Sequence, residues 1–247
     1  PIYTIIDVAG INTLDFSALE TNLVVILAET RVTDGLNTVV YSGIQSIITG
    51  SGNDTFYIIG EQSYDLDGGA GDDIFLFIND GSVGGKISGR IDGGGGHDSL
   101  DYSNDETTLL TGRSFILTKL GSQDGFDGEE KATILGGFAN IDRIVGGKGV
   151  DTIQGVNSDA QYHIYYDMVE YFSAGKSSGE GNQSGQGNKL EIDDIENLVG
   201  GDANDSFIFF QGYRMDFSML AALPDPINSI DGKGGVDTLD YSLYNSN

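Results

Sequence analysis

The sequence predicts an all-β protein, a parallel β-helix or β-roll (a β-solenoid) with loop insertions. Glycine-rich turns that end in an aspartate recur along the chain, and a short apolar strand follows each turn at once, as in Gly68–Leu76. The chain contains 38 glycines and only 3 prolines, yet 38% of its residues are hydrophobic. It therefore has apolar material to bury as well as turns, which favours stacked strands over a disordered glycine-rich chain.

The turn unit follows the pattern G-G-x-G-x-D-x-U-x, in which U is a large apolar residue. Glycines allow a positive φ, which can direct several backbone carbonyls toward one point. The aspartate adds a carboxylate oxygen, and Ca2+ binds six to eight oxygens. The apolar residue two positions later points inward because side chains alternate along a strand. Each unit therefore predicts a metal-binding turn joined to a core strand.

Six copies keep the aspartate and the apolar residue in step, and a seventh at Gly10–Leu14 has asparagine in place of the aspartate. Three of the six lack one glycine, at Thr49, Ala203 or Lys233. The predicted Ca2+ ligands are the turn aspartates and the carbonyls of turn glycines: Asp54, Asp73, Asp98, Asp151, Asp205, Asp237, Gly50, Gly52, Gly69, Gly71, Gly94, Gly96, Gly147 and Gly149.

The closest spacing of turns lies in the first half of the chain. Asp54, Asp73 and Asp98 follow one another at intervals of 19 and 25 residues. One coil of a β-solenoid takes roughly 18–25 residues, as in the shorter repeat periods of such proteins. These three turns are therefore expected to stack on one edge, with Ca2+ between successive turns.

The segments between the turns read as short strands. Tyr3–Val8 is expected to be a strand that caps the apolar stack, and Leu23–Leu27 is a β-rich apolar run typical of a buried strand. Ile44–Ile48 leads into the turn of Asp54, and Thr55–Ile59 leads out of it.

A longer repetition overlies the turn unit. A phrase Thr/Ser-Leu-Asp-aromatic-Ser begins near residues 13, 99 and 238. Residues 1–247 are therefore expected to form one elongated domain with blocks 1–98 and 99–237 and a restart at 238–247. In the second block, Phe115–Leu120 repeats Leu23–Leu27, and Ile141–Val145 and Ile195–Val199 repeat Ile44–Ile48.

Two insertions interrupt the second block. Gly121–Lys131 is acidic, and we predict a solvated loop there, with a separate cation site as the alternative. Residues 173–189 are rich in Ser, Gly, Gln and Asn, which predicts a flexible insertion.

Charge and composition exclude several classes of function. The chain has 12 Lys and Arg against 38 Asp and Glu, a formal charge of -26. Such a chain repels nucleic acid and anionic lipid and attracts divalent cations. It has no cysteine, which excludes disulfides and thiolate metal sites. It has no apolar run of about 18 residues, so no membrane span is predicted.

No catalytic residues are predicted, because the chain has neither a histidine pair at metal-binding spacing nor a G-x-S-x-G elbow. Two alternatives remain open. One is a polysaccharide-active β-helix enzyme, and the other is a glycan- or ice-binding module. The residues that would serve them are Asp15, Asp101 and Asp240 as a groove of acids, Tyr57, Tyr102 and Tyr241 as an aromatic stripe, and Thr55, Thr152 and Thr238 as a threonine row. A solvated acidic face and ordinary strand packing are the commoner reasons for such residues.

The six aspartate turns resemble the RTX (haemolysin-type calcium-binding) repeats of secreted bacterial proteins. The phrases Leu-Asp-Tyr-Ser and Ile-Glu-Asn-Leu-Val-Gly-Gly resemble those of very large bacterial surface proteins. The resemblance implies a right-handed parallel β-roll in which turn aspartates and glycine carbonyls bind Ca2+ after export. RTX repeats commonly run back to back, whereas these turns lie up to 54 residues apart, so two-turn sites are expected first at Asp54, Asp73 and Asp98.

The function implied by this resemblance is structural or adhesive. We expect a calcium-stabilised extracellular module of a bacterial protein, serving as a stalk, a spacer or an assembling surface or filament subunit. The expected partners are Ca2+ and neighbouring repeats or further copies arranged head to tail. Surface glycans are a further candidate partner.

Overall fold

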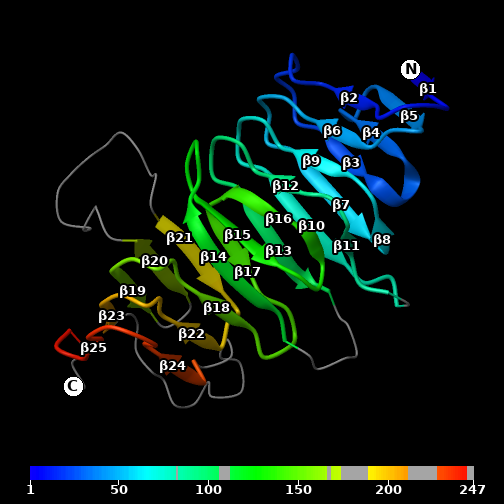
Figure 1. Cartoon of the computed structure of the whole chain (residues 1–247). Coiled ribbons are helices and arrows are strands. Elements are labelled where there is room, and N and C mark those ends of the chain that lie inside the picture. Colours follow the sequence, from blue (N-terminus) through cyan, green and yellow to red (C-terminus); the bar gives the residue numbers. More distant parts are fainter. Residues whose placement is uncertain (82, 106–111, 166–167, 174–188, 211–226, 244–247) are drawn as a thin grey trace, which may run out of the picture.

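The computed structural model describes residues 1–81, 83–105, 112–165, 168–173, 189–210 and 227–243. Within these ranges the regular elements are β-strands, apart from one 3-10 turn, η1 (Leu27–Glu29) (Figure 1). The predicted all-β class is confirmed. The predicted insertion at 173–189 lies outside the described residues except for its two ends, which belong to neighbouring antiparallel strands.

The described strands form two long sheets. In spatial order, sheet A contains β1 (Ile2–Ile6), β5 (Thr38–Ser42), β4 (Arg31–Thr33), β3 (Val24–Ile26), β7 (Thr55–Ile59), β10 (Ile74–Ile78), β13 (Ser99–Asn104), β17 (Arg143–Val145), β21 (Lys189–Asp193), β20 (Val169–Ser173), β19 (Ala160–Ile164), β23 (Asp205–Phe209) and β25 (Thr238–Asp240). Sheet B contains β2 (Thr13–Asp15), β6 (Ser46–Ile48), β9 (Asp65–Asp67), β12 (Ile91–Asp92), β16 (Ile134–Ile141), β15 (Phe126–Glu130), β14 (Ser114–Leu120), β18 (Thr152–Gln154), β22 (Asn197–Val199) and β24 (Ser229–Asp231). Two short strands, β8 (Glu61–Gln62) and β11 (Lys86–Ile87), pair beside sheet B.

Most neighbouring strands are parallel, and the chain repeatedly crosses between the sheets. From β6 to β13 the main strands alternate, with β6, β9 and β12 in sheet B and β7, β10 and β13 in sheet A. Strands β7, β10 and β13 stack in register, so that Thr55 lies opposite Ile74 and Ile74 opposite Ser99. Figure 1 shows the result, in which the sheets run from the N-terminal strands at one end to the C-terminal strands at the other.

Three antiparallel meanders interrupt the parallel order. They consist of β3–β4–β5 and β19–β20–β21 in sheet A and β14–β15–β16 in sheet B. The segments Leu23–Leu27 and Phe115–Leu120 are predicted to be repeats of one another. The first contains β3 and the second lies within β14, and each of these strands begins a meander. The predicted correspondence therefore reflects a real similarity in connection, although the two meanders lie in different sheets.

The acidic segment Gly121–Lys131 was expected to be a solvated loop, and this prediction was wrong. It contains strand β15, in which Phe126 and Glu130 are buried. The Glu130 carboxylate accepts a hydrogen bond from the backbone N–H of Thr133 at 2.7 Å. Backbone N–H groups inside the meander, and not water alone, therefore satisfy the Glu130 carboxylate.

The prediction that Ile141–Val145 is equivalent to Ile44–Ile48 was also wrong. The earlier segment forms β6 in sheet B, whereas β17 pairs with β13 in sheet A. The difference arises from the β14–β15–β16 meander. Its strands occupy three adjacent positions of sheet B, and the chain then crosses to sheet A, so the segment after the meander pairs in sheet A instead of sheet B. As a consequence, the turn of Asp151 leads into β18 of sheet B, while the other aspartate turns lead into sheet A.

The hydrophobic core is one cluster of buried residues from Leu14 to Phe207, with contributions from both sheets. Inward residues alternate with half-exposed ones along β7 and β10, as the strand period requires. Stacked rings follow the strand register: the ring centroids of Phe56 and Phe75 lie 4.7 Å apart, and those of Tyr162 and Phe207 lie 4.6 Å apart. The parallel register thus places like side chains one above another, and their burial stabilises the stack.

The Phe56–Phe75 stack provides a test of this core. Replacing Phe75, which is fully buried, by alanine is expected to lower the free energy of unfolding by about 3–5 kcal/mol, because it removes a buried ring and leaves a cavity. The neighbouring Ile74→Ala, at a side chain that is 39% exposed, is expected to cost less than about 1 kcal/mol. Urea denaturation followed by circular dichroism measures both, and equal losses would contradict the assigned strand face.

Candidate metal-binding turns

The aspartates at the stacked turns of sheet A are buried and linked to one another. Asp54, Asp73 and Asp98 are each 0% exposed. The backbone N–H of Asp54 donates to Oδ1 of Asp73 at 2.7 Å, and the N–H of Asp73 donates to Oδ1 of Asp98 at 2.9 Å. At the two ends, the N–H of Leu23 donates to Asp54 and that of Asp98 donates to Oδ2 of Asp142. We call this row of acids the carboxylate ladder. Its existence confirms that these three turns stack.

The glycines of these turns are needed because the turns approach one another closely. Gly94 has a φ of +100°, and a Cβ atom there would lie 2.0 Å from the carbonyl oxygen of Gly69. The carbonyl of Gly69 accepts a hydrogen bond from the N–H of Gly95, and the carbonyl of Gly50 accepts one from Ala70. Carbonyls predicted as Ca2+ ligands at Gly50 and Gly69 therefore hold adjacent turns together through backbone hydrogen bonds.

The remaining predicted glycines occupy the same stacks. Gly71 donates its N–H to the carbonyl of Gly95, and Gly96 donates its N–H to Asp124 at 3.0 Å. A Cβ at Gly52 would lie 2.5 Å from the carbonyl carbon of Thr21. Gly147 donates its N–H to Oδ2 of Asp151 at 2.7 Å, and Gly149 lies in the bend just before Asp151.

Two ladder carboxylates leave an oxygen without a hydrogen bond. Oδ2 of Asp73 and Oδ2 of Asp98 are buried and accept no hydrogen bond from any described residue. Burial raises the pKa of Asp73 to about 9 and that of Asp98 to about 8; hydrogen bonds from backbone amides oppose this shift, and neighbouring carboxylates reinforce it. A buried carboxylate oxygen of this kind requires a proton or a cation as partner.

The later turns form two shorter ladders. The N–H of Asp205 donates to Oδ1 of Asp237 at 3.0 Å, so these two turns are adjacent although 32 residues separate them. Asp205 is buried and Asp237 is exposed. Asp151 accepts the N–H of Arg113 and donates its own N–H to Glu196, which places it in a separate ladder beside sheet B. The six predicted aspartates therefore lie in three groups.

Sequence reasoning missed two buried acids. Asp142 belongs to the carboxylate ladder and is 3% exposed, and Glu196 belongs to the ladder of Asp151 beside sheet B and is 2% exposed. Both stand directly before a strand, and an apolar residue follows two positions later, Ile144 or Leu198. They thus carry the second half of the turn pattern without its glycines. A search for an acid two positions before a core residue would have found them.

Substituted glycine positions are accommodated in different ways. Thr49 is fully buried, and its hydroxyl donates to the carbonyl of Gly68 in the next turn at 2.7 Å. Lys233 adopts a φ of +61°, a left-handed conformation that favours glycine. The first substitution adds a bond between turns, whereas the second retains backbone strain.

Asp124 lies beside the end of the carboxylate ladder. Carboxylate oxygens of Asp98, Asp124 and Asp142 lie within 4.8 Å of one another. Burial is the main cause that raises the pKa of Asp142 to about 6. Asp124 belongs to the turn between β14 and β15, so the alternative prediction of a separate cation site in Gly121–Lys131 corresponds to this cluster.

The acids considered for a catalytic groove have a local structural role. Asp15, Asp101 and Asp240 each accept the backbone N–H of the serine two residues later, at 2.7–2.9 Å. These bonds form a repeated Asx turn at the end of the strand.

The aromatic stripe and the threonine row do not form single surfaces. Tyr102 is fully buried and stacks on Phe77 with centroids 4.1 Å apart. Thr55 lies in sheet A and Thr152 in sheet B.

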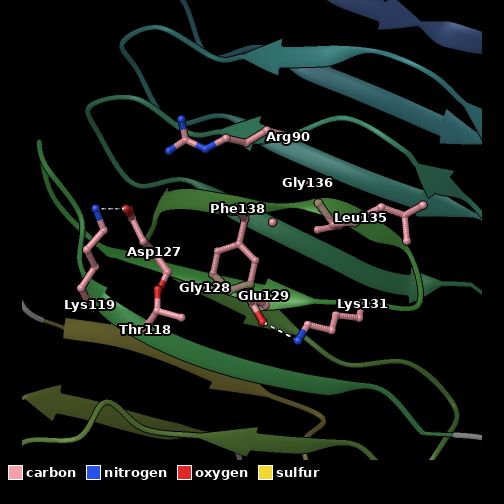
Figure 2. Close-up of a pocket in the computed structure, with 12 residues that line it drawn as sticks. Arg90, Thr118, Lys119, Asp127, Gly128, Glu129, Lys131, Leu135, Gly136 and Phe138 are labelled. Atoms are coloured by element: carbon pink, nitrogen blue, oxygen red, sulfur yellow. Dashed lines mark hydrogen bonds and ion pairs between the residues drawn. The ribbon is translucent and has the colours of Figure 1, made fainter.

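A cavity of about 230 Å³ lies on sheet B beside the meander (Figure 2). Three basic side chains line it, but each is paired with a carboxylate. Lys119 lies 3.0 Å from Asp127 and Lys131 lies 2.9 Å from Glu129, as the dashed lines in Figure 2 show, and Arg90 lies 3.4 Å from Asp92. The cavity therefore offers little unpaired positive charge to an anionic ligand.

No known protein-family model matches the chain, and no curated protein sequence matches it. The resemblance to RTX repeats thus stays a prediction. Among the described residues, no helix has the length and apolar character needed to cross a membrane.

The close approach of the turns can be tested at Gly94. Gly60 also has a positive φ, +65°, but no atom lies within 4 Å of its Cβ position, so it serves as the control. Gly60→Ala is expected to cost about 1–2 kcal/mol of stability from backbone strain alone. Gly94→Ala is expected to cost clearly more because it also pushes two turns apart. Urea denaturation measures the free energy of unfolding of both variants. Equal losses of stability in Gly60→Ala and Gly94→Ala would contradict the close contact between the turns.

The raised pKa values predict how stability depends on pH in the absence of divalent ions. Because folding raises the pKa of Asp73 and Asp98 from about 3.8 to about 9 and 8, the folded chain binds these protons more tightly than the unfolded chain. Their stabilising contribution is complete below about pH 4 and is lost as the pH rises through 8 to 9. In chelator, the free energy of unfolding is expected to be lower at pH 9 than at pH 5. A rise over this interval would contradict the burial of these carboxyls.

Proposed function

We propose that this chain is a calcium-stabilised structural or adhesive module, built as a right-handed parallel β-helix with meander insertions. The observation that carries the proposal is the carboxylate ladder, in which buried oxygens of Asp73 and Asp98 accept no hydrogen bond from the described residues. Hard carboxylate oxygens in stacked turns are the ligands that Ca2+ prefers.

The strand order supports the β-helix. Parallel strands that alternate between two sheets, as β6 to β13 do, follow the path of a chain winding around a common core. Crossover connections between parallel strands of one sheet are right-handed in about 98% of cases. The meanders would then be local excursions within single coils.

Electrostatics supplies the reason for a cation. The chain carries a formal charge of -26, and its ladder brings carboxylates together where burial penalises their charge. A bound divalent ion offsets both costs. Each site stabilises the folded state by RT ln(1 + [Ca]/Kd), about 1.4 kcal/mol at ten times Kd. Because the turns are hydrogen-bonded in series, ions at neighbouring turns would reinforce one another, as in other repeat proteins.

The proposed biological role is that of a stalk, a spacer or an assembling subunit outside a bacterial cell, where Ca2+ is available. Sheet A ends in β1 and β25, whose outer residues Ile2, Ile6 and Leu239 are more than half exposed. Open strand edges of this kind pair with further strands. We propose that neighbouring repeats or further copies stack on them head to tail.

Asp73→Asn tests the cation directly. Asparagine keeps the oxygen that accepts the N–H of Asp54 but removes the charge. Saturating Ca2+ at ten times Kd is expected to raise the melting temperature of the unaltered chain by about 3–6 °C per site. The variant is expected to lose part of this gain while remaining at least as stable as the unaltered chain in chelator. Circular dichroism melting curves with chelator and with Ca2+ measure both effects.

The control for Asp73→Asn is Glu61→Gln, which removes one charge from a side chain that is 73% exposed. It is expected to retain the full response to Ca2+, and Mg2+ at equal ionic strength controls for screening. Superimposable melting curves of the unaltered chain in chelator and in Ca2+ would refute the proposal.

A further inference from the structure

The cluster of Asp98, Asp124 and Asp142 differs in origin from the repeated turns. Asp98 closes a glycine turn, and Asp142 follows β16 and precedes β17. Asp124 lies in the short connection between β14 and β15, which is part of an insertion rather than a repeat. Three separate segments of the chain thus bring carboxylates within 4.8 Å of one another.

Hydrogen bonds fix two of these carboxylates and leave one oxygen of each unused. Asp98 is 0% exposed; its Oδ1 accepts the N–H of Asp73, and its Oδ2 accepts no hydrogen bond. Oδ2 of Asp124 accepts the N–H of Gly96 at 3.0 Å, while its Oδ1 is buried and also accepts none. A buried carboxylate oxygen without a donor, beside two further carboxylates, requires a proton or a cation as partner.

Backbone hydrogen bonds fix the connection that carries Asp124. Gly121 donates its N–H to the carbonyl of Gly125 at 3.0 Å, which closes the connection between β14 and β15. Gln123 donates its N–H to Oδ1 of Asn140 at 3.0 Å. The connection therefore lies against the end of β16, and its acid is presented to the glycine turn by a preformed backbone.

We propose that Asp98, Asp124 and Asp142 form a separate divalent-cation site, best suited to Ca2+, that locks the β14–β15–β16 meander onto the glycine turn of Asp98. It deepens the proposed function by assigning one ion to an insertion, but it does not require that ions occupy the other turns. The ligands are carboxylates alone, without histidine or cysteine, which selects a hard cation.

The separation of the oxygens also bears on the identity of the ion. Ligands on opposite sides of one ion lie apart by twice the metal–oxygen distance, roughly 4.6–5.2 Å for Ca2+ and roughly 4.0–4.2 Å for Mg2+. Three oxygens within 4.8 Å of one another can therefore surround one Ca2+ ion after a small adjustment of their side chains. Mg2+ would need a tighter cluster and a stricter geometry.

The experiment counts ions on the full chain. Isothermal titration calorimetry with Ca2+ is expected to show one bound equivalent fewer for Asp124→Asn than for the unaltered chain. The control, Glu129→Gln, removes a charge from the same meander at a side chain that is 45% exposed and pairs with Lys131, and it is expected to keep every equivalent. An unchanged number and affinity of bound ions in Asp124→Asn would overturn the proposal.

A second measurement on the unaltered chain does not depend on the folding of a variant. Hydrogen exchange in Ca2+ and in chelator is expected to show increased protection at the amides of Gly96 and of the 121–125 connection. No change in protection there would overturn the site. The outcome is separable from that of the turn ladder, because Asp73→Asn is expected to leave this protection unchanged. If Ca2+ raised the melting temperature of the unaltered chain but not that of Asp124→Asn, the ion at the meander alone would account for the stabilisation, and the general role of the turns would be refuted.

Discussion

The structure depends on one constraint, which is the burial of the Asp54, Asp73 and Asp98 carboxylates at the stacked turns of sheet A. At the aspartate turns, the N–H of the aspartate that stands before a strand of sheet A lies at the edge of the core, where it requires an acceptor. The aspartate of the next turn supplies it, as Asp73 does for Asp54. The same carboxylate then carries its charge into a place where burial raises its pKa. One residue thus stabilises the backbone and creates an electrostatic cost.

The glycines and the acids of the turn act together. Close contact between turns is possible because Gly94 and similar residues have no side chain, and this contact lets one carboxylate reach the backbone of the neighbouring turn. Thr49 shows that a larger residue is tolerated when its hydroxyl bonds the next turn. The pattern therefore encodes a distance between turns as well as a conformation. This distance determines whether a cation can be shared.

The meanders explain how a repetitive chain acquires individual sites. The insertion between β13 and β17 shifts the phase of the repeat, so that the turn of Asp151 leads into sheet B and pairs with Glu196. The same insertion brings Asp124 to the ladder. An acidic segment that looks like a solvent-facing loop thereby supplies a buried oxygen to a cluster of three carboxylates.

The sequence by itself determined the all-β class, the strand after each glycine turn and the stacking of Asp54, Asp73 and Asp98, because these follow from local turn chemistry, strand alternation and nearly equal spacing. It did not identify Asp142 as a further member of the carboxylate ladder. Only the tertiary structure decided which sheet each turn joins, that Asp205 lies beside Asp237, and that Asp142 and Asp124 approach Asp98. These contacts depend on the number of strands that an insertion adds to a sheet, and each antiparallel meander breaks the regular spacing of the turns, so the chain carries no periodic signal for them.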